Sequence, residues 1–257
     1  MPANDLRLLI DAARSAGKVA TPFWRQSPVV WEKADEAGPV TEADLAVDAI
    51  LKQQLLAARP DYGWLSEETE DEPGRLTNDR IFIVDPIDGT RSFIAGETTW
   101  SHSIAVAEKG QIIAAAVFLP MLDKLYTAHI GGGAQLNGVT IRHSNTARFP
   151  GASVLSARPN FDPMHWQGGT PPVQRHFRAS LAYRLALVAE GRFDAMLTLR
   201  DTWEWDVAAG TLLVLEAGAL VTDKHGAAPV FNNLNPKLSG MLAGTRAVHA
   251  GLRERLL

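Results

Sequence analysis

Hydrophobic positions recur every three or four residues in several stretches of the chain, and this spacing predicts helices with one buried face. The first stretch covers residues 5–23, the second covers 41–58 and the third covers 180–189. In the second stretch Thr41 has the residue type of an N-cap, and Asp44 lies at the third helical position. A capping interaction and a functional role therefore explain Asp44 equally well.

Short runs rich in apolar and β-branched residues predict strands between and after these helices. Strands are expected at residues 62–66, 81–84, 102–107, 111–119, 125–130, 139–141, 154–157, 193–199 and from about 220. Asn137-Gly138 is typical of a tight hairpin turn. The glycines at 131–133 match neither common phosphate-loop spacing, so we interpret them as part of the same hairpin region. A final short helix is expected near the C-terminus.

Three segments interrupt this pattern. Residues 69–80 are acidic and contain Pro73-Gly74, which predicts a mobile surface loop. Composition changes at about residues 144–151, so we expect an N-terminal α+β region, 1–150, with a metal and phosphate site, and a C-terminal α/β region, 151–257, that supplies Asp206 and substrate contacts. Residues 159–172 are polar and proline-rich, which predicts a flexible loop near a functional site.

The most informative block follows the apolar run at 81–84, which predicts a buried strand. Pro86 cannot donate to a sheet ladder, so the strand is expected to end there, between the carboxylates of Asp85 and Asp88. Gly89 permits a positive φ, and a short helix from about Ser92 would aim backbone N–H groups at an anion. A solvated Asp-Gly turn is the alternative. The whole block favours Mg²⁺-assisted phosphate chemistry, because magnesium prefers carboxylate oxygens and shares its shell with phosphates.

Two further acidic segments occur where elements are expected to begin or end. Glu67-Glu68 follows the predicted strand at 62–66, although, taken alone, a solvated pair of glutamates would explain it better. Asp206 lies at the predicted start of a helix that ends at Gly218, where an N-cap role needs no metal. Asp206 becomes a candidate metal ligand only because the other acidic segments exist.

Composition narrows the possible classes of function. The chain has 257 residues, a formal net charge of −4 and no cysteine. The charge gives no case for a nucleic-acid polymer as partner, and the lack of cysteine excludes a thiolate metal site and a cysteine nucleophile. Charged residues interrupt the N-terminus, and the longest apolar runs are too short to cross a bilayer, so we expect a cytoplasmic protein without membrane contact.

Taken together, three motifs resemble the inositol monophosphatase superfamily, whose members are Mg²⁺-dependent, lithium-sensitive phosphomonoesterases. The motifs are Glu67-Glu68, Asp85-Pro86-Ile87-Asp88-Gly89-Thr90 and Trp205-Asp206-Val207-Ala208-Ala209-Gly210, in the family's order and approximate spacing. The resemblance implies an α/β (α+β) fold, a layered αβαβα sandwich. It also implies a homodimer, a small phosphorylated metabolite as substrate, and two or three Mg²⁺ ions.

The resemblance also implies roles for single residues. The metal ligands would be Glu67, Asp85, the main-chain carbonyl of Ile87, Asp88 and Asp206. Glu67, Thr90 and Asp44 would activate the attacking water, and Gly89 and Thr90 would hold the phosphate. Asp206 would also lie near the leaving group. Lys33 and Thr41 match positions near a third metal.

Three substrate groups within the superfamily remain open. The segment 188–194, its spacing to Asp206, and Arg184 in place of a lysine are similar to the bisphosphate nucleotidase branch. Arg184 would suit a second phosphate, or it could be a solvated helix charge. This favours a 3′(2′),5′-bisphosphate nucleotidase. Inositol-1-monophosphatase and then histidinol-phosphatase are the alternatives, because the short segment 93–103 is more like those enzymes.

Two other classes are set below these. Haloacid-dehalogenase phosphatases also place Asp-Gly-Thr after an apolar strand, but their two aspartates are two residues apart, whereas Asp85 and Asp88 are three apart. A catalytically idle relative that serves as a binding or regulatory protein is the other. All the implied metal ligands are present, which argues against it.

Overall fold

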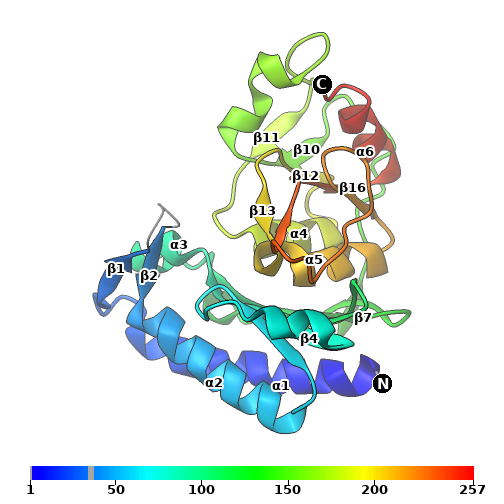
Figure 1. Ribbon diagram of the computed structural model, residues 1–257. Coiled ribbons are helices and arrows are strands. Elements are labelled where there is room, and N and C mark those ends of the chain that lie inside the picture. The colour runs from blue at the N-terminus through cyan, green and yellow to red at the C-terminus, as the bar shows by residue number, and fades with distance from the viewer. Residues whose placement is uncertain (1, 34–37) are drawn as a thin grey trace.

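The computed structural model describes residues 2–33 and 38–257, and it stacks helices and sheets in alternating layers (Figure 1). Helices α1 (Pro2–Ala20) and α2 (Glu42–Ala58) cover one face of a seven-stranded sheet. Helices α4 (Leu181–Ala189) and α5 (Glu204–Glu216) cover its other face and separate it from a five-stranded sheet. Helix α6 (Arg246–Arg253) packs on the far side of that smaller sheet. The expected layered αβαβα fold is therefore confirmed.

The large sheet has the strand order β3-β4-β5-β6-β7-β8-β9, and all neighbouring pairs except β3–β4 are antiparallel. Its strands are β3 (Gly63–Ser66), β4 (Arg80–Asp88), β5 (Ser101–Glu108), β6 (Gln111–Leu119), β7 (Lys124–His129), β8 (Gly133–Leu136) and β9 (Val139–Ile141). The turn between β8 and β9 has positive φ at Asn137 (49°) and Gly138 (81°), which confirms the predicted hairpin.

The smaller sheet has the order β11-β10-β12-β16-β14, with parallel pairs on one side and antiparallel pairs on the other. Its strands are β10 (Ser153–Leu155), β11 (Gln174–His176), β12 (Ala195–Thr198), β14 (Leu220–Thr222) and β16 (Met241–Gly244). Two short pairs complete the strands: β1 (Val30–Glu32) with β2 (Pro39–Thr41), and β13 (Thr202–Trp203) with β15 (Lys237–Leu238). The predicted boundary near residue 150 falls between the two main sheets and stays a prediction.

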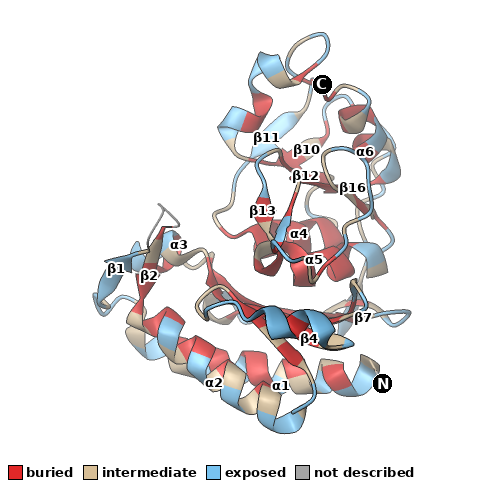
Figure 2. Cartoon of the chain, in the orientation of Figure 1, coloured by how far each residue is buried: buried red, intermediate tan, exposed pale blue. Residues whose placement is uncertain are grey.

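The run at 81–84 is continuously apolar because β4 is buried on both faces. Phe82 and Val84 point into the core formed with α1 and α2, whereas Ile81 and Ile83 point into the core formed with α4 and α5. Side chains of a strand alternate between faces, so both registers must be hydrophobic when both faces are covered. Figure 2 shows buried residues concentrated along the sheet and the helix faces that contact it. The carboxylates at the end of β4 therefore stand on a strand fixed from two sides.

Strand β4 continues past the point where the sequence predicts its end. The strand runs through Pro86 to Asp88, and its pairing with β5 shifts register between Asp85 and Asp88. The prediction that Pro86 ends the strand is therefore wrong. Proline is tolerated here because a bulge removes the demand for a ladder hydrogen bond. As a result, both aspartates stand on one element.

The segment at 69–80 lies at the surface, as predicted, and one buried side chain anchors it to the rest of the fold. It contains a 3₁₀ helix, Pro73–Thr77, and Arg75 is buried within it. Arg75 donates to Asp71 of the same segment and to Asn232, which lies far away in the chain. A buried guanidinium with this many partners anchors the segment.

The segment at 159–172 is largely exposed, as expected of a loop, but buried aromatic side chains anchor it. It includes nearly all of two 3₁₀ helices, Arg158–Phe161 and Pro163–His165. The buried Trp166 stacks on Phe161 and donates from Nε1 to the main-chain oxygen of Asn160 at 2.9 Å. Polar, proline-rich composition alone does not reveal these aromatic anchors.

Helix α2 begins at the predicted place. Thr41 is its N-cap, and a capping box joins the Thr41 side chain to the backbone and Asp44 to the N-cap backbone. Within the described ranges, no helix is long and apolar enough to span a membrane.

Candidate active site

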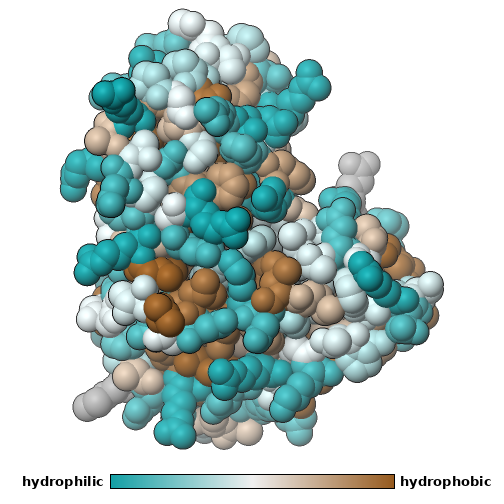
Figure 3. Space-filling model, turned by 180° about the vertical axis from the view of Figure 1, so that it is seen from behind, coloured by the Kyte–Doolittle hydropathy of each residue, from teal (hydrophilic) through white to brown (hydrophobic). Residues whose placement is uncertain are grey.

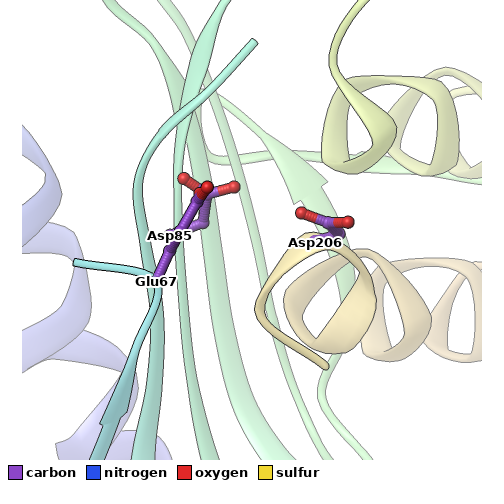
Figure 4. A group of neighbouring side chains, drawn as sticks. All are labelled: Glu67, Asp85 and Asp206. Atoms are coloured by element: carbon purple, nitrogen blue, oxygen red, sulfur yellow. The ribbon is translucent and has the colours of Figure 1, made fainter. Parts of the chain in front are cut away.

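Three carboxylates from separate elements meet where the large sheet faces α5. One oxygen each from Glu67, Asp85 and Asp206 lies within 4.8 Å of the other two. Glu67 directly follows β3, Asp85 stands on the adjacent parallel strand β4, and Asp206 is the third residue of α5. Figure 4 shows Glu67 and Asp85 side by side on the sheet and Asp206 opposite them at the end of the helix. The structure therefore brings together residues separated by up to 139 positions in the sequence (206 minus 67).

Asp206 is not the N-cap of its helix. Helix α5 begins at Glu204 with Trp203 as its N-cap, so the capping explanation for Asp206 is wrong. Asp206 lies in the first turn instead, where the positive end of the helix dipole favours a negative charge. Its carboxylate is directed out of the helix end towards the sheet (Figure 4).

Asp85 is fully buried, and its Oδ1 has no hydrogen-bond partner among the described residues. Burial, and next the charges of Glu67, Asp88 and Asp206, raise the pKa of Asp85 well above its usual range. An unpaired buried carboxylate oxygen is costly unless a proton or a cation compensates it. Hard carboxylate oxygens in this arrangement are the ligands that Mg²⁺ prefers, so the residues fit such an ion.

Asp88 lies at the same end of β4 but binds the start of α4. Its oxygens accept from Ser180 Oγ at 2.6 Å, from the N–H of Leu181 at 3.2 Å and from the N–H of Ala182 at 2.6 Å. Burial raises the pKa of Asp88 to about 6 despite these hydrogen bonds, which favour the charged form. Asp88 thus lies beside the group of three rather than within it.

Asp44 serves its helix cap and also contacts the active-site turn. One oxygen accepts from Thr41, and the other accepts from Thr90 Oγ1 at 3.2 Å. The Thr90 hydroxyl also lies 3.1 Å from the carbonyl oxygen of Ile87. Burial raises the pKa of Asp44 to about 6. Asp44 therefore caps helix α2 and also lies beside the active-site turn, as predicted.

Lys33 forms ion pairs with both glutamates of the Glu67-Glu68 motif. Its Nζ lies 2.7 Å from Glu67 Oε1 and 2.8 Å from Glu68 Oε1. Burial alone would lower the pKa of Lys33, but the two glutamates outweigh it and raise the value to about 12. Burial and the charge of Glu67 raise the pKa of Glu68 to about 7. The alternative of a solvated glutamate pair is therefore wrong.

Gly89 ends the bulged strand and starts helix α3 (Thr90–Ile94) with a φ of 102°. This left-handed conformation is strained for residues with a side chain, which explains the glycine. The first helical N–H groups after Gly89 point out of the helix, as expected of a first turn.

A cavity of about 600 Å³ is lined by Glu67, Asp85, Ile87, Asp88, Gly89, Thr90 and Asp206 among others. Its wall includes Arg184, which the structure buries: Nε donates to the carbonyl of Arg178 at 2.5 Å, and the guanidinium lies 4.6 Å from the Phe177 ring centroid. The alternative of a solvated helix charge is therefore wrong. Burial lowers the pKa of Arg184 to about 10.

Sequence reasoning missed several residues of this wall. Arg200 follows β12 and is exposed at the cavity, and Asn160 is buried at its edge. For Arg200, the only sequence signal is its position directly after a predicted strand. The cavity is also lined by Gly38, Pro39, Arg91, Ala157, Pro159, Ala179, Leu181 and Thr198.

Comparison with known proteins agrees with this geometry. A model of the inositol monophosphatase family matches residues 2–256. The chain is 36% identical to an inositol-1-monophosphatase of Rhizobium meliloti and 34% identical to a histidinol-phosphatase of Chlorobaculum parvum, with 86% of each chain covered in both pairs. Its structure is similar to the extragenic suppressor protein suhB of Bartonella henselae, with a TM-score of 0.82 and 29% identity over 98% of this chain and 97% of that one.

The electrostatics of Asp85 predict an unusual effect of Asp85→Asn in the absence of divalent ions. The raised pKa means that the folded chain holds a proton that the unfolded chain releases, so stability falls as the pH rises above about 4. At pH 8 with EDTA, Asp85→Asn should raise the melting temperature by at least about 2 °C, because it removes a charge that folding must bury.

Near pH 4 the difference in melting temperature should nearly vanish, since Asp85 is then neutral in the folded chain and about half protonated in the unfolded chain. Asp201→Asn at the exposed Asp201 is the control and should change neither value. Equal melting temperatures of the parent and Asp85→Asn at pH 8 would contradict the buried-charge interpretation.

Proposed function

Because the chain belongs to the inositol monophosphatase family and is therefore a phosphatase, we propose that it hydrolyses a small phosphate monoester with Mg²⁺ as its cofactor. One observation carries the choice of cofactor: Asp85 has a buried oxygen without a partner, beside Glu67 and Asp206. Such a group of oxygens favours a divalent cation over any arrangement of protein hydrogen bonds.

The proposed ligands of two or three Mg²⁺ ions come from three elements. They are the carboxylates of Glu67, Asp85, Asp88 and Asp206 and the main-chain carbonyl of Ile87. Bound Mg²⁺ would neutralise phosphate charge and lower the pKa of a coordinated water. Asp85 and Asp88 stand on either side of the bulge in β4, which supports a role in binding separate ions.

Asp44, Thr90 and Glu67 are proposed to orient the attacking water. When the Thr90 hydroxyl donates to Asp44, the lone pairs of its oxygen can accept a hydrogen from that water. The Glu67 carboxylate is the proposed proton acceptor, and the ammonium of Lys33 at 2.7 Å keeps it oriented.

The turn at Gly89 and Thr90 is proposed to hold the phosphoryl oxygens through its backbone N–H groups. The positive φ of Gly89 turns the chain at the end of β4, so these groups lie close to the carboxylates. Donors fixed in this way stabilise negative charge as it develops during the reaction. Asp206, across the cavity, is proposed to lie near the leaving group.

Inositol 1-phosphate is the leading substrate candidate. The supporting observation is that two relatives, 36% and 31% identical, are named inositol-1-monophosphatases. Histidinol phosphate follows for the same reason, because a relative that is 34% identical is named a histidinol-phosphatase.

A bisphosphate nucleotide is a candidate on different grounds. The cavity wall carries the buried guanidinium of Arg184 and the exposed guanidinium of Arg200 near the acidic group. Two cations beyond those needed for the scissile phosphate suit a substrate with a second anionic group. This keeps 3′-phosphoadenosine 5′-phosphate as a candidate substrate.

The substrate question is decided by phosphate release from inositol 1-phosphate, histidinol phosphate and 3′-phosphoadenosine 5′-phosphate. We expect turnover that needs Mg²⁺ and is inhibited by Li⁺, with the highest kcat/KM for inositol 1-phosphate. Asp85→Asn should lower kcat more than about 100-fold, because it removes several kcal/mol of metal-dependent stabilisation. Tight Mg²⁺ binding without turnover on any substrate would instead indicate an idle binding or regulatory relative.

Arg200→Leu separates inositol 1-phosphate from 3′-phosphoadenosine 5′-phosphate as the substrate. Because Arg200 is exposed, its replacement should leave the fold intact. If Arg200 contacts a second phosphate, kcat/KM for 3′-phosphoadenosine 5′-phosphate should fall by about 10-fold or more, in line with the loss of a charge-assisted hydrogen bond. The value for inositol 1-phosphate should change less than about two-fold. Equal losses on both substrates would contradict a second-phosphate role.

The family resemblance also supports a homodimer as the assembly. In the view from behind, hydrophobic atoms gather around the middle and lower left of the molecule, and hydrophilic atoms prevail above them (Figure 3). Contiguous apolar surface of this kind is typical of interaction sites. Light scattering on the purified chain should give twice the chain mass of 27.9 kDa, and a single chain mass would rule the dimer out.

A further inference from the structure

A second polar network lies beside the acidic group and joins segments far apart in the sequence. Arg75 is buried in the segment that follows Glu67, and Glu204 is fully buried at the first residue of α5. Asn232 and Asn233 lie between them and contact both side chains. Figure 1 shows the orange loop before β16 reaching down towards the cyan segment in front of β4.

Arg75 uses its whole guanidinium in this network. Nη1 donates to Asn232 Oδ1 at 2.5 Å, and Nη2 donates to the carbonyl of Asn233 at 2.8 Å. Nε and Nη2 also bind both oxygens of Asp71, at 2.6 and 2.8 Å. The planar guanidinium therefore fixes the loop at 232–233 against the segment at 71–75 in one orientation.

Glu204 completes the network from the helix side. Its carboxylate accepts from the N–H of Asn232 at 2.7 Å, and from the N–H and the Nδ2 of Asn233 at 2.9 and 2.7 Å. The N–H of Glu204 donates to the carbonyl of Pro236 at 2.9 Å. Asn232 has a φ of 64°, a conformation that asparagine adopts more readily than most residues. The start of α5 is thus tied to this loop from two directions.

The network connects the two sides of the acidic group. Glu204 precedes Asp206 by two residues at the start of the same helix, and Arg75 belongs to the segment that leaves the sheet after Glu67. Carboxylates held this close repel one another, so their spacing must be enforced by surrounding structure. The network supplies such a restraint without itself touching the cavity, whose wall includes none of its residues.

We propose that this network, Arg75–Asn232–Asn233–Glu204, holds Asp206 at the distance from Asp85 that a shared cation needs. The inference rests on the proposed function, since it takes Asp206 as a Mg²⁺ ligand. Its members are positioning residues. Groups that orient metal ligands from outside the coordination shell commonly change metal affinity by about 10–100-fold when they are replaced.

The test uses Arg75→Met and Glu204→Gln in the full chain. Arg75→Met removes the donors and keeps much of the side-chain length, and Glu204→Gln turns one acceptor into a donor that faces N–H groups. Calorimetric titration with Mg²⁺ should give dissociation constants about 10–100-fold above that of the parent. The Mg²⁺ dependence of turnover should shift by the same factor, whereas KM at saturating Mg²⁺ should stay within about two-fold.

Asp5→Asn is the matched control for the loss of a buried charge. Asp5 lies on α1, across the large sheet, and accepts from Arg59 Nε at 2.9 Å and from the Tyr62 hydroxyl at 3.1 Å. This variant should lower the melting temperature and leave Mg²⁺ affinity unchanged. Arg75→Lys, which keeps the charge, replaces Arg75→Met if that variant does not fold, and it should show a smaller loss of affinity.

The inference is overturned if the network variants lose thermal stability as Asp5→Asn does but bind Mg²⁺ with parental affinity. A parent chain that binds no Mg²⁺ gives a different result, because it refutes the proposed cofactor before any variant is compared. Melting curves with and without Mg²⁺ give an independent reading, since the Mg²⁺-induced shift should shrink in both network variants.

Discussion

Glu67, Asp85 and Asp206 place carboxylate oxygens within 4.8 Å of one another at the junction of the large sheet and α5. Like charges at this distance oppose folding unless protons or cations compensate them. The surrounding structure therefore has two tasks, which are to force the group together and to leave room for a compensating ion. Burial of β4 on both faces serves the first task, and the cavity of about 600 Å³ serves the second.

The three carboxylates are positioned by different kinds of contact. Strands β3 and β4 are adjacent parallel neighbours in the large sheet, so backbone hydrogen bonds fix Glu67 relative to Asp85. Asp206 is on a helix, so no strand pairing fixes it relative to Asp85. Its position depends on how α5 packs and on the contacts at the first turn of α5. The contacts of Glu204 with Asn232 and Asn233 are long-range contacts of this kind.

The sequence was informative where local pattern and chemistry coincide. The apolar run at 81–84, the capping box at Thr41 and the hairpin at Asn137-Gly138 were all predicted, because each depends on neighbouring residues. The acidic motifs were recognisable for the same reason. Strand β4 was predicted too short, since a bulge at Pro86 depends on the partner strand β5 and not on the proline itself.

Long-range contacts account for most of what was missed. Arg75 lies in an acidic surface segment, and its contacts with Asn232 and Asn233, more than 150 residues away, could not be predicted from its neighbours in sequence. The packing of Trp166 on Phe161 likewise has no signature in composition. Arg200 carries no motif, and only the fold places it at the cavity.

The covering of β4 on both faces has a consequence for local opening of the protein. Amide hydrogens in the middle of such a strand exchange with solvent only when the whole molecule unfolds, whereas ends and surface segments exchange through smaller fluctuations. The carboxylate of Asp85 follows directly on this most protected stretch, so breathing motions elsewhere leave it in place. Of the three carboxylates, Asp85 alone is thereby anchored in the stretch that is expected to come apart last.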